Sequence, residues 1–311
     1  MSSSAGSTFP RQRGPRRGTY SIVARDAATG ALGVAVQSHW FSVGSVVPAA
    51  SAGVGAIATQ AFPDVQHKPK ALALLREGRA ADEVLAALLQ EDDAAPHRQL
   101  AIIDPSGRAA GHTGRSCIRE AGHVVGDGYV CQANMMRGPE VWPAMAAAYE
   151  ATLGQGLTAA LLAALDAAEL AGGDLRGRQS AAMLIVPAEG TDADRIVDVR
   201  VDDSPEPLAE LRRLVALNDA YVLADEGDAL LAHEDMAGAA QRYIGAYEAA
   251  PDKVELVFWA ALGLMSAGLA DRGLVLLRDV IEQDERWLEL LRRLDPASVP
   301  AQPEALRLLG R

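Results

Sequence analysis

Cysteine, lysine and aromatic residues are scarce in this chain, and their scarcity excludes several classes of protein. Only two of the 311 residues are cysteines, which is too few for a disulfide framework or a thiolate metal cluster. Aromatic residues make up 5% of the chain while hydrophobic residues make up 49%, so the core is expected to consist mainly of Ala, Leu and Val. This composition indicates a soluble α/β or α+β protein.

Long apolar segments are also missing. No apolar run reaches the roughly 18 residues that a membrane-spanning helix requires. The first 18 residues contain four arginines and no acidic residue, and they lack the apolar stretch of a secretory signal. We therefore expect a cytoplasmic protein that has no membrane partner.

The charge balance and the histidine spacing exclude further partners. A net charge of -12 repels phosphate backbones, and beyond residue 18 no Lys or Arg cluster offsets it, so we expect no nucleic-acid partner. The six histidines lack the tight spacing of metal ligands. Accordingly, we expect neither a metal nor a cofactor.

The apolar pattern divides the chain into three parts. Residues 1–18 cannot bury enough apolar surface to become ordered, and we expect a flexible tail or propeptide. Regular structure begins at Thr19, where two β-rich runs around Gly30 predict a hairpin. Further strands are expected over 43–49, 53–61, 100–103, 108–113, 124–125, 129–131, 181–186 and 196–201, and helices over 68–90 (a pair), 139–151, 156–171 and 205–215. Blocks of strands separated by helix pairs indicate a layered α+β fold.

Beyond residue 216 the pattern is entirely helical. Ala239 and Tyr243 recur 34 residues later as Gly273 and Leu277, which is the period and part of the small-and-large spacing of tetratricopeptide repeats. Three such repeats are usually needed for independent stability. We therefore expect this segment to pack on the main domain or on a second copy, which makes a homo-oligomer the expected state.

Four sequence motifs occur together and in order. They are Thr19-Tyr-Ser-Ile-Val-Ala-Arg-Asp26, Ala58-Thr-Gln-Ala61, Gln132-Ala-Asn-Met-Met136 and Ala171-Gly-Gly-Asp-Leu-Arg-Gly-Arg-Gln-Ser180. In this order they resemble the Ntn-hydrolase-like family called domain of unknown function 1028, over about residues 19 to 215.

This resemblance implies an α+β fold with two domains. Residues 19–216 are expected to form a four-layer αββα sandwich of the N-terminal-nucleophile (Ntn) hydrolase type. Residues 217–311 are expected to form a small all-α helical-hairpin domain, and this segment also resembles one that related proteins assign to peptidoglycan binding.

The resemblance gives Thr19 the role of nucleophile. In Ntn hydrolases the hydroxyl at the start of the first strand attacks an amide once its own α-amine is free, because that amine has a pKa near 8 and serves as the base. Eighteen residues precede Thr19, so it becomes terminal only if they are removed. The alternative is that Thr19 only begins an edge strand.

Asn134 is the second candidate. A side-chain amide can donate to the oxygen of a tetrahedral intermediate, which is what amide hydrolysis requires. Equally, Asn134 could cap the helix that follows. Ala133 stands where relatives usually have glycine, and this disfavours a positive φ at that position.

The third group of candidates lies in a glycine-bracketed loop. Asp174 can orient the nucleophile or an amine, while Arg176 and Arg178 can bind a substrate carboxylate, with Gln179 beside them. The alternative is an Asp/Arg ion pair that only holds the loop. Further candidate substrate-binding residues are Ser38, Gln60 and Gln132.

These residues predict hydrolysis of a small, non-protein amide. None of the three lysines lies in a strand beside Thr19, so the α-amine has to transfer the proton unaided. Cys117 and Cys131 lack a histidine partner motif for a thiol nucleophile. The alternatives are a non-catalytic binding or scaffold protein, and a zymogen whose N-terminal tail covers the site.

Overall fold

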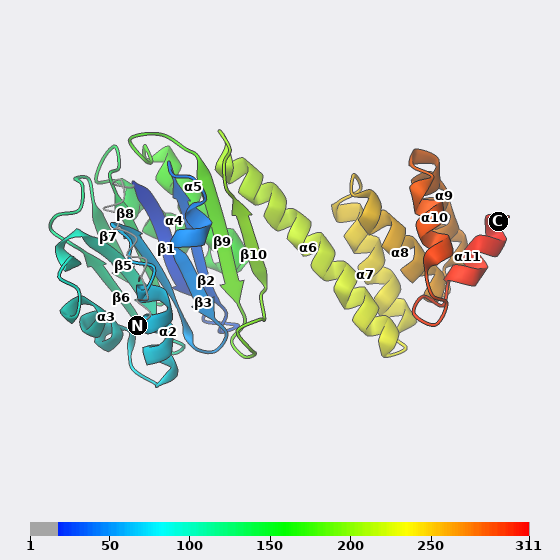
Figure 1. The fold of residues 1–311 in the computed structure, drawn as a ribbon, viewed down its shortest axis with the longest axis horizontal. Coiled ribbons are helices and arrows are strands. Elements are labelled where there is room, and N and C mark those ends of the chain that lie inside the picture. The colour runs from blue at the N-terminus through cyan, green and yellow to red at the C-terminus, as the bar shows by residue number, and fades with distance from the viewer. Residues whose placement is uncertain (1–17, 311) are drawn as a thin grey trace, which may run out of the picture. The chain divides into compact units, whose positions relative to one another are not determined.

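The computed structural model describes residues 18–310, which divide into two compact units with their boundary between Arg212 and Arg213. The first unit combines antiparallel sheets with helices and the second is helical, so the fold is of the mixed α+β class (Figure 1). Apart from Gly18, the tail expected over residues 1–18 lies outside the described residues.

The larger sheet contains six strands in the order β10-β9-β2-β1-β8-β7, and every neighbouring pair is antiparallel. They are β1 (Thr19–Arg25), β2 (Leu32–Ser38), β7 (Gly122–Gly126), β8 (Tyr129–Asn134), β9 (Ser180–Val186) and β10 (Val197–Val201). β1 and β2 form the predicted hairpin, whose turn contains Gly30 at a φ of 75°. Because β1 lies between β2 and β8, Thr19 has neighbours on both sides.

The smaller sheet contains four antiparallel strands in the order β3-β4-β5-β6. They are β3 (Pro48–Ser51), β4 (Gly55–Ala61), β5 (Arg98–Ile103) and β6 (Ala109–Thr113). The predicted hairpin around residues 104–107 is formed by β5 and β6. This sheet packs face to face on the larger one, with β4 on β1, β3 on β2 and β5 on β8.

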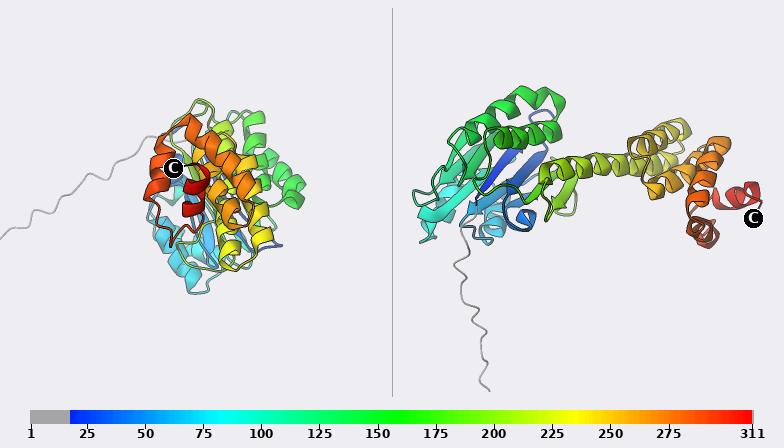
Figure 2. Two further views of the ribbon diagram at one scale, coloured as in Figure 1. Left: turned by 90° about the vertical axis from the view of Figure 1, so that its right-hand side faces the viewer. Right: turned by 90° about the horizontal axis from the view of Figure 1, so that it is seen from above.

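Two pairs of helices cover the sheets (Figure 2). Helices α4 (Val141–Thr152) and α5 (Leu157–Leu170) pack on the larger sheet, whereas α2 (His67–Arg76) and α3 (Ala81–Gln90) pack on the smaller one. Short 3₁₀ turns occur over Ala95–His97 and Leu153–Gln155.

Small and branched apolar side chains fill the space between the two sheets. This core includes Val34 and Val36 of β2 with Ala56 and Ala58 of β4, and each is fully buried. A second core, which includes Ile57 and Leu100, lies between the smaller sheet and α2 and α3. Burying such a side chain stabilises the fold by about 1.5–3 kcal/mol for residues as large as Val or Ile.

The strand predicted over 43–49 is wrong. Residues Val43–Val46 form a single helical turn, α1, and the strand begins only at Pro48. Valine favours strands, but Val43 and Val47 are only 2% exposed because the turn packs them into the core between the sheets. The backbone amide of Val43 donates to the Ser180 hydroxyl, which holds the turn in place.

The second unit consists of helices joined by short turns. Its elements are the greater part of α6 (Pro207–Ala232), then α7 (Met236–Ala249), α8 (Val254–Ser266), α9 (Ala270–Gln283), α10 (Arg286–Arg293) and α11 (Gln302–Leu308). The helix predicted to end near Val215 instead continues to Ala232. Apolar residues beyond that point, such as Ala220 and Leu223, pack on Ala246 and Leu256 and so extend the helix. The boundary between the two compact units therefore falls inside a continuous helix.

The residues that repeat at a spacing of 34 lie at buried positions of the helical unit. Ala239 and Tyr243 are buried in α7, and Gly273 and Leu277 are buried in α9. A Cβ atom on Gly273 would lie 2.4 Å from the Ala261 carbonyl oxygen, so α9 approaches α8 closely only because that position has no side chain.

Candidate functional site

The first residue of β1 lies in a row of polar side chains across the larger sheet. Thr19 pairs with Ser38 of β2 on one side and with Asn134 of β8 on the other. Ser38 in turn pairs with Ser180 of β9. Residues directly opposed in antiparallel strands project from the same face, and each of these four is at most 1% exposed. We call these four residues the Thr19 row.

The Thr19 row faces the smaller sheet. Ser21 lies two residues further along β1, and its hydroxyl donates a 2.6 Å hydrogen bond to Oε1 of Gln60 in β4. The Nε2 atom of Gln60 donates to the Thr19 carbonyl oxygen at 3.1 Å. Because side chains two apart on a strand share a face, Thr19 also points into the space between the sheets.

Three donors surround the carbonyl oxygen of Gly18. The Thr19 hydroxyl donates to it at 2.7 Å and Nη2 of Arg176 donates at 2.9 Å. The Ser38 hydroxyl donates as well, and it also lies 3.1 Å from the Thr19 hydroxyl. The carbonyl that precedes the candidate nucleophile is therefore polarised by one guanidinium and two hydroxyl groups.

Asp174 is buried against Gly18. Its carboxylate accepts hydrogen bonds from Arg176 Nη2 at 2.8 Å, from the Arg176 amide at 2.9 Å and from the His39 amide at 3.2 Å. A Cβ atom on Gly18 would lie 2.7 Å from Asp174 Oδ2, which leaves room only for glycine. Asp174 and Arg176 thus form an ion pair, which is the alternative considered for this loop. Both residues also contact Gly18.

The other candidates of this loop face a different set of partners. Arg178 forms ion pairs with Glu169 at 3.4 Å and with Glu206. Gln179 donates to Asp203 at 3.0 Å. Within residues 18–310 neither side chain has a hydrogen bond to the Thr19 row. Asp174 and Arg176 therefore lie beside Gly18, whereas Arg178 and Gln179 bind carboxylates elsewhere.

Side-chain amides of both sheets meet beneath Thr19. Asn134 Nδ2 lies 3.0 Å from Gln99 Oε1 and 3.4 Å from the Thr19 carbonyl oxygen. Gln60 Nε2 donates to the same Gln99 oxygen at 2.8 Å. Gln132 donates to Ser21 at 3.2 Å, and its own Oε1 atom is buried without a partner among the described residues.

Gln99 is a central member of this amide cluster that the sequence analysis missed. It lies at the start of β5 and is fully buried. It shares its face with Ala101 and Ile103, which pack in the core between the sheets. A single amide in an otherwise apolar alternating run was the signal that could have identified it.

A pocket of about 440 Å³ opens beside Asn134. It is lined by Ala61, Phe62, His97, Ser116, Cys117, Ile118, Arg119 and Asn134. We call it the Asn134 pocket. It lies where the ends of β4 and β8 meet the 114–121 loop, which connects the edge strands β6 and β7.

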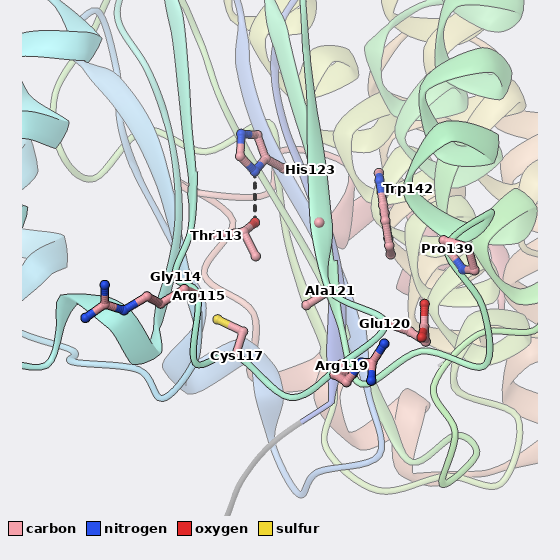
Figure 3. A pocket seen from close by; sticks show the side chains of 11 residues that line it. Thr113, Gly114, Arg115, Cys117, Arg119, Glu120, Ala121, His123, Pro139 and Trp142 are labelled. Carbon is pink, nitrogen blue, oxygen red and sulfur yellow. Dashed lines mark hydrogen bonds between the residues drawn. The ribbon is translucent and has the colours of Figure 1, made fainter.

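A second pocket of about 580 Å³ lies on the other side of the same loop (Figure 3). His123 of β7 faces Thr113 of β6 there, with 2.8 Å between the ring Nδ1 and the hydroxyl, and Trp142 lines the helix side. Burial lowers the pKa of His123. Cys117 lines both pockets, and burial raises the pKa of its thiol to about 11, which keeps it protonated.

Strained backbone gathers around the same end of the sheets. Ser42, Ala61, Glu120 and Met135 have φ values between 51° and 65°, a conformation that residues with a Cβ rarely adopt. Ala61 lines the Asn134 pocket and Met135 directly follows Asn134. Such strain persists where the surrounding structure enforces it, and it is commonly found at functional sites.

Two features are absent from residues 18–310. No group of three or more His, Cys, Asp or Glu side chains is placed to hold a metal ion. No helix in this part of the chain is long and apolar enough to cross a membrane.

Fold and site together define a two-sheet α+β protein whose central strand opens with a buried threonine. The chain belongs to the family of unknown function DUF1028, whose model matches residues 19–211. The membership in domain of unknown function 1028 that the motifs predicted is thereby confirmed, and the match begins at Thr19.

One solved structure supports the same assignment. The crystal structure of protein SPO2555 from Silicibacter pomeroyi, which contains the DUF1028 domain, matches with a TM-score of 0.57 and 34% identity. The match covers 63% of this chain and 84% of that one. No curated protein matches the chain.

Proposed function

We propose that this protein hydrolyses a small, non-protein amide with Thr19 as an N-terminal nucleophile on an αββα sandwich of the Ntn type. The main observation that supports this proposal is the position of Thr19. It is the first residue of β1, and it lies beside Ser38, Asn134 and the Asp174–Arg176 ion pair. The helix pairs on the outer faces of two packed sheets support the fold assignment.

The proposed reaction requires a free α-amine at Thr19. That amine takes the proton of the Thr19 hydroxyl, and the hydroxyl oxygen attacks the carbonyl carbon of the substrate. The Nδ2 group of Asn134 stabilises the tetrahedral oxyanion. The amine of the substrate leaves with the proton, and water then hydrolyses the ester on Thr19.

Arg176 and Asp174 have complementary parts in this scheme. The Arg176 guanidinium donates to the Gly18 carbonyl oxygen at 2.9 Å, and after cleavage a positive charge at this place would disfavour protonation of the α-amine. Asp174 holds the guanidinium and limits this effect. No lysine is needed, in keeping with the absence of lysine from β1 and its neighbours.

The contacts of Gly18 support cleavage of the Gly18–Thr19 bond by the protein itself. Thr19 and Gly18 are both buried, which hinders a host protease from reaching the bond. The donors around the Gly18 oxygen, Ser38 and Arg176, are suited to stabilise an oxyanion during attack by the Thr19 hydroxyl. Attack replaces the amide by an ester, which water then cleaves.

The second candidate function is a non-catalytic binding or scaffold role. One observation favours it: with Gly18 attached, Thr19 is 1% exposed and its nitrogen belongs to a peptide bond. A zymogen is the related alternative, in which this arrangement is the inactive form.

Turnover and intact mass together test the proposal. We expect protein that begins at Thr19 to hydrolyse members of a small-amide panel, and we expect Thr19→Ala to lose at least about 10³-fold in kcat. Thr19→Ser is the matched control because it keeps the hydroxyl and the amine, and it should retain measurable turnover. Equal turnover by chains that still contain Gly18 would favour an internal nucleophile or the binding role.

Three wider features are part of the proposal. A cytoplasmic location is in keeping with two free thiols, Cys117 and Cys131, which persist in a reducing compartment. The helical unit is proposed to be tetratricopeptide-like, on the buried 34-residue spacing of α7 and α9. Homo-oligomerisation is proposed through that unit.

A further inference from the structure

The 114–121 loop fixes one arginine beside Asn134. The backbone amides of Met135 and Met136, which follow Asn134, donate to the carbonyl oxygens of Ile118 at 3.3 Å and Glu120 at 3.1 Å. Arg119 lies between these two anchored residues and lines the Asn134 pocket. Its backbone is therefore placed by the same chain segment that positions the proposed oxyanion donor.

Arg119 has no carboxylate partner among the described residues. Two other arginines at this end of the sheets are neutralised, Arg176 by Asp174 and Arg178 by Glu169 and Glu206. No Asp or Glu lines the Asn134 pocket. Arg119 also lines the neighbouring pocket, where Glu120 is a wall residue as well. An exposed arginine that lines a pocket without acidic residues and has no carboxylate partner favours an anionic ligand.

Most of the remaining pocket wall is apolar or aromatic, and Ser116 adds a hydroxyl group. Phe62 and His97 face each other with ring centroids 5.9 Å apart, and Ile118 and Ala61 complete the wall. Asn134 contributes an uncharged amide to the pocket, whereas Arg119 contributes a positive charge. The Nδ2 atom of Asn134 lies 3.4 Å from the Thr19 carbonyl oxygen. A pocket with an amide side chain, a largely apolar and aromatic wall and an arginine matches a ligand with three corresponding parts.

We propose that the Asn134 pocket binds the body of the substrate and that Arg119 selects amides that also bear a carboxylate. In this arrangement the scissile amide lies at Asn134 and Thr19, an apolar or aromatic stem contacts Phe62 and His97, and the carboxylate pairs with Arg119. The placement of the scissile amide at Asn134 and Thr19 rests on the proposed function. Recognition of the carboxylate by Arg119 does not depend on it.

Arg119 acts here as a specificity-determining residue. A planar guanidinium can donate two parallel N–H hydrogen bonds, one to each oxygen of a carboxylate, which a neutral analogue cannot reproduce. This assignment differs from a role for Arg176 or Arg178 in carboxylate binding, because both of those guanidinium groups already have carboxylate partners.

Equilibrium binding to the full chain tests the inference without turnover. The probes are 4-carbamoylbenzoate, which carries an amide and a carboxylate on one ring, and the neutral 4-acetylbenzamide. By calorimetry, we expect the carboxylate probe to bind about tenfold more tightly, as one charge-assisted contact at a partly exposed site supplies. This ratio should fall to about one in Arg119→Gln and be partly retained in Arg119→Lys.

Arg115→Gln is the matched control. Arg115 belongs to the same loop and is also exposed, but it lines only the neighbouring pocket, and Figure 3 shows its side chain pointing away from the other labelled residues. This variant should keep the full preference for the carboxylate probe. A preference that is absent from the wild type, unchanged in Arg119→Gln, or lost equally in Arg115→Gln would overturn the inference.

The result separates this inference from the proposed function. If Arg119→Gln abolishes the preference while Thr19→Ala leaves turnover unchanged, the pocket assignment stands and the nucleophile assignment fails. If Thr19→Ala abolishes turnover while the preference survives in Arg119→Gln, the reverse holds. In active protein, Arg119→Gln should raise KM for carboxylate-bearing amides and leave kcat nearly unchanged.

Discussion

At the scale of single residues, the contacts of Gly18 connect the candidate nucleophile with the rest of the site. Its carbonyl oxygen accepts from Thr19, Ser38 and Arg176, and its Cα packs on Asp174. The position is restricted to glycine by the carboxylate and not by the backbone angle. A single small residue thus allows the donors to converge.

The first prediction concerns these donors. Ser38→Ala and Arg176→Gln should each slow the appearance of chains that begin at Thr19, by about 10²-fold or more, because each removes one donor to the developing oxyanion. Arg178→Gln is the control, since Arg178 bonds to Glu169 and Glu206. Intact-mass spectrometry of purified protein over time measures the rate. Equal rates in all variants would assign the cut to another protease.

A second prediction concerns Cys117. Burial raises the pKa of its thiol to about 11, so at pH 8 only about 1 in 10³ molecules carries a thiolate, compared with roughly a quarter for a free cysteine of pKa near 8.5. Alkylation by iodoacetamide should therefore be slow at pH 8 and should accelerate up to about pH 11. Labelling followed by peptide mass mapping checks this.

At the scale of elements, the start of α2 is anchored by a buried histidine. His67 is 3% exposed, and its Nε2 lies 3.3 Å from Asp92, which in turn bonds to Arg98 of β5. Burial lowers the pKa of His67 in spite of the neighbouring carboxylates Asp64 and Asp92, which act in the opposite direction. α2 is thereby tied to the smaller sheet by a neutral imidazole.

The third prediction follows from the sign of that pKa shift. The unfolded chain takes up a proton on His67 near pH 6.5 while the folded protein resists it, so stability falls as the pH drops from about 6.5 through the lowered pKa. His67→Gln should reduce the pH dependence of Tm in this window. His233→Gln, at an exposed position of the helical unit, should leave it unchanged. Thermal unfolding between pH 5 and 7.5 measures both, and identical slopes would contradict the assignment.

At the scale of the whole molecule, the helical unit carries several exposed apolar side chains. Val275 is 57% exposed, and Met236, Leu269 and Trp259 are each about 40% exposed. A small helical unit with this surface gains stability by burying it against another copy. Self-association through the helical unit is the expected state.

The fourth prediction tests this association. Val275→Asp should shift the protein toward monomer, because the charge would have to be desolvated in an apolar interface. Leu170→Asp is the control, as Leu170 is 90% exposed but belongs to the first unit. Light scattering coupled to size exclusion gives the molar mass, and a wild type that is monomeric at all concentrations would refute the expectation.

The sequence alone determined those features that depend on local chain chemistry. Alternating apolar residues on either side of Gly30 specify the first hairpin, and the four ordered motifs predicted the family. Local preference was insufficient where packing opposed it: Val43 enters the core from a helical turn, and α6 continues past Val215 because its later residues pack on α7 and α8.

Only the tertiary structure decided which polar groups meet. Gln99 joins Asn134 because β5 packs across β1 and β8, and Arg119 reaches the Asn134 pocket because the residues after β8 bond to its loop. These contacts join strands far apart in the sequence, and no local pattern specifies them. The sequence therefore pointed to Thr19 and Asn134, whereas the partners of each depended on how the two sheets pack.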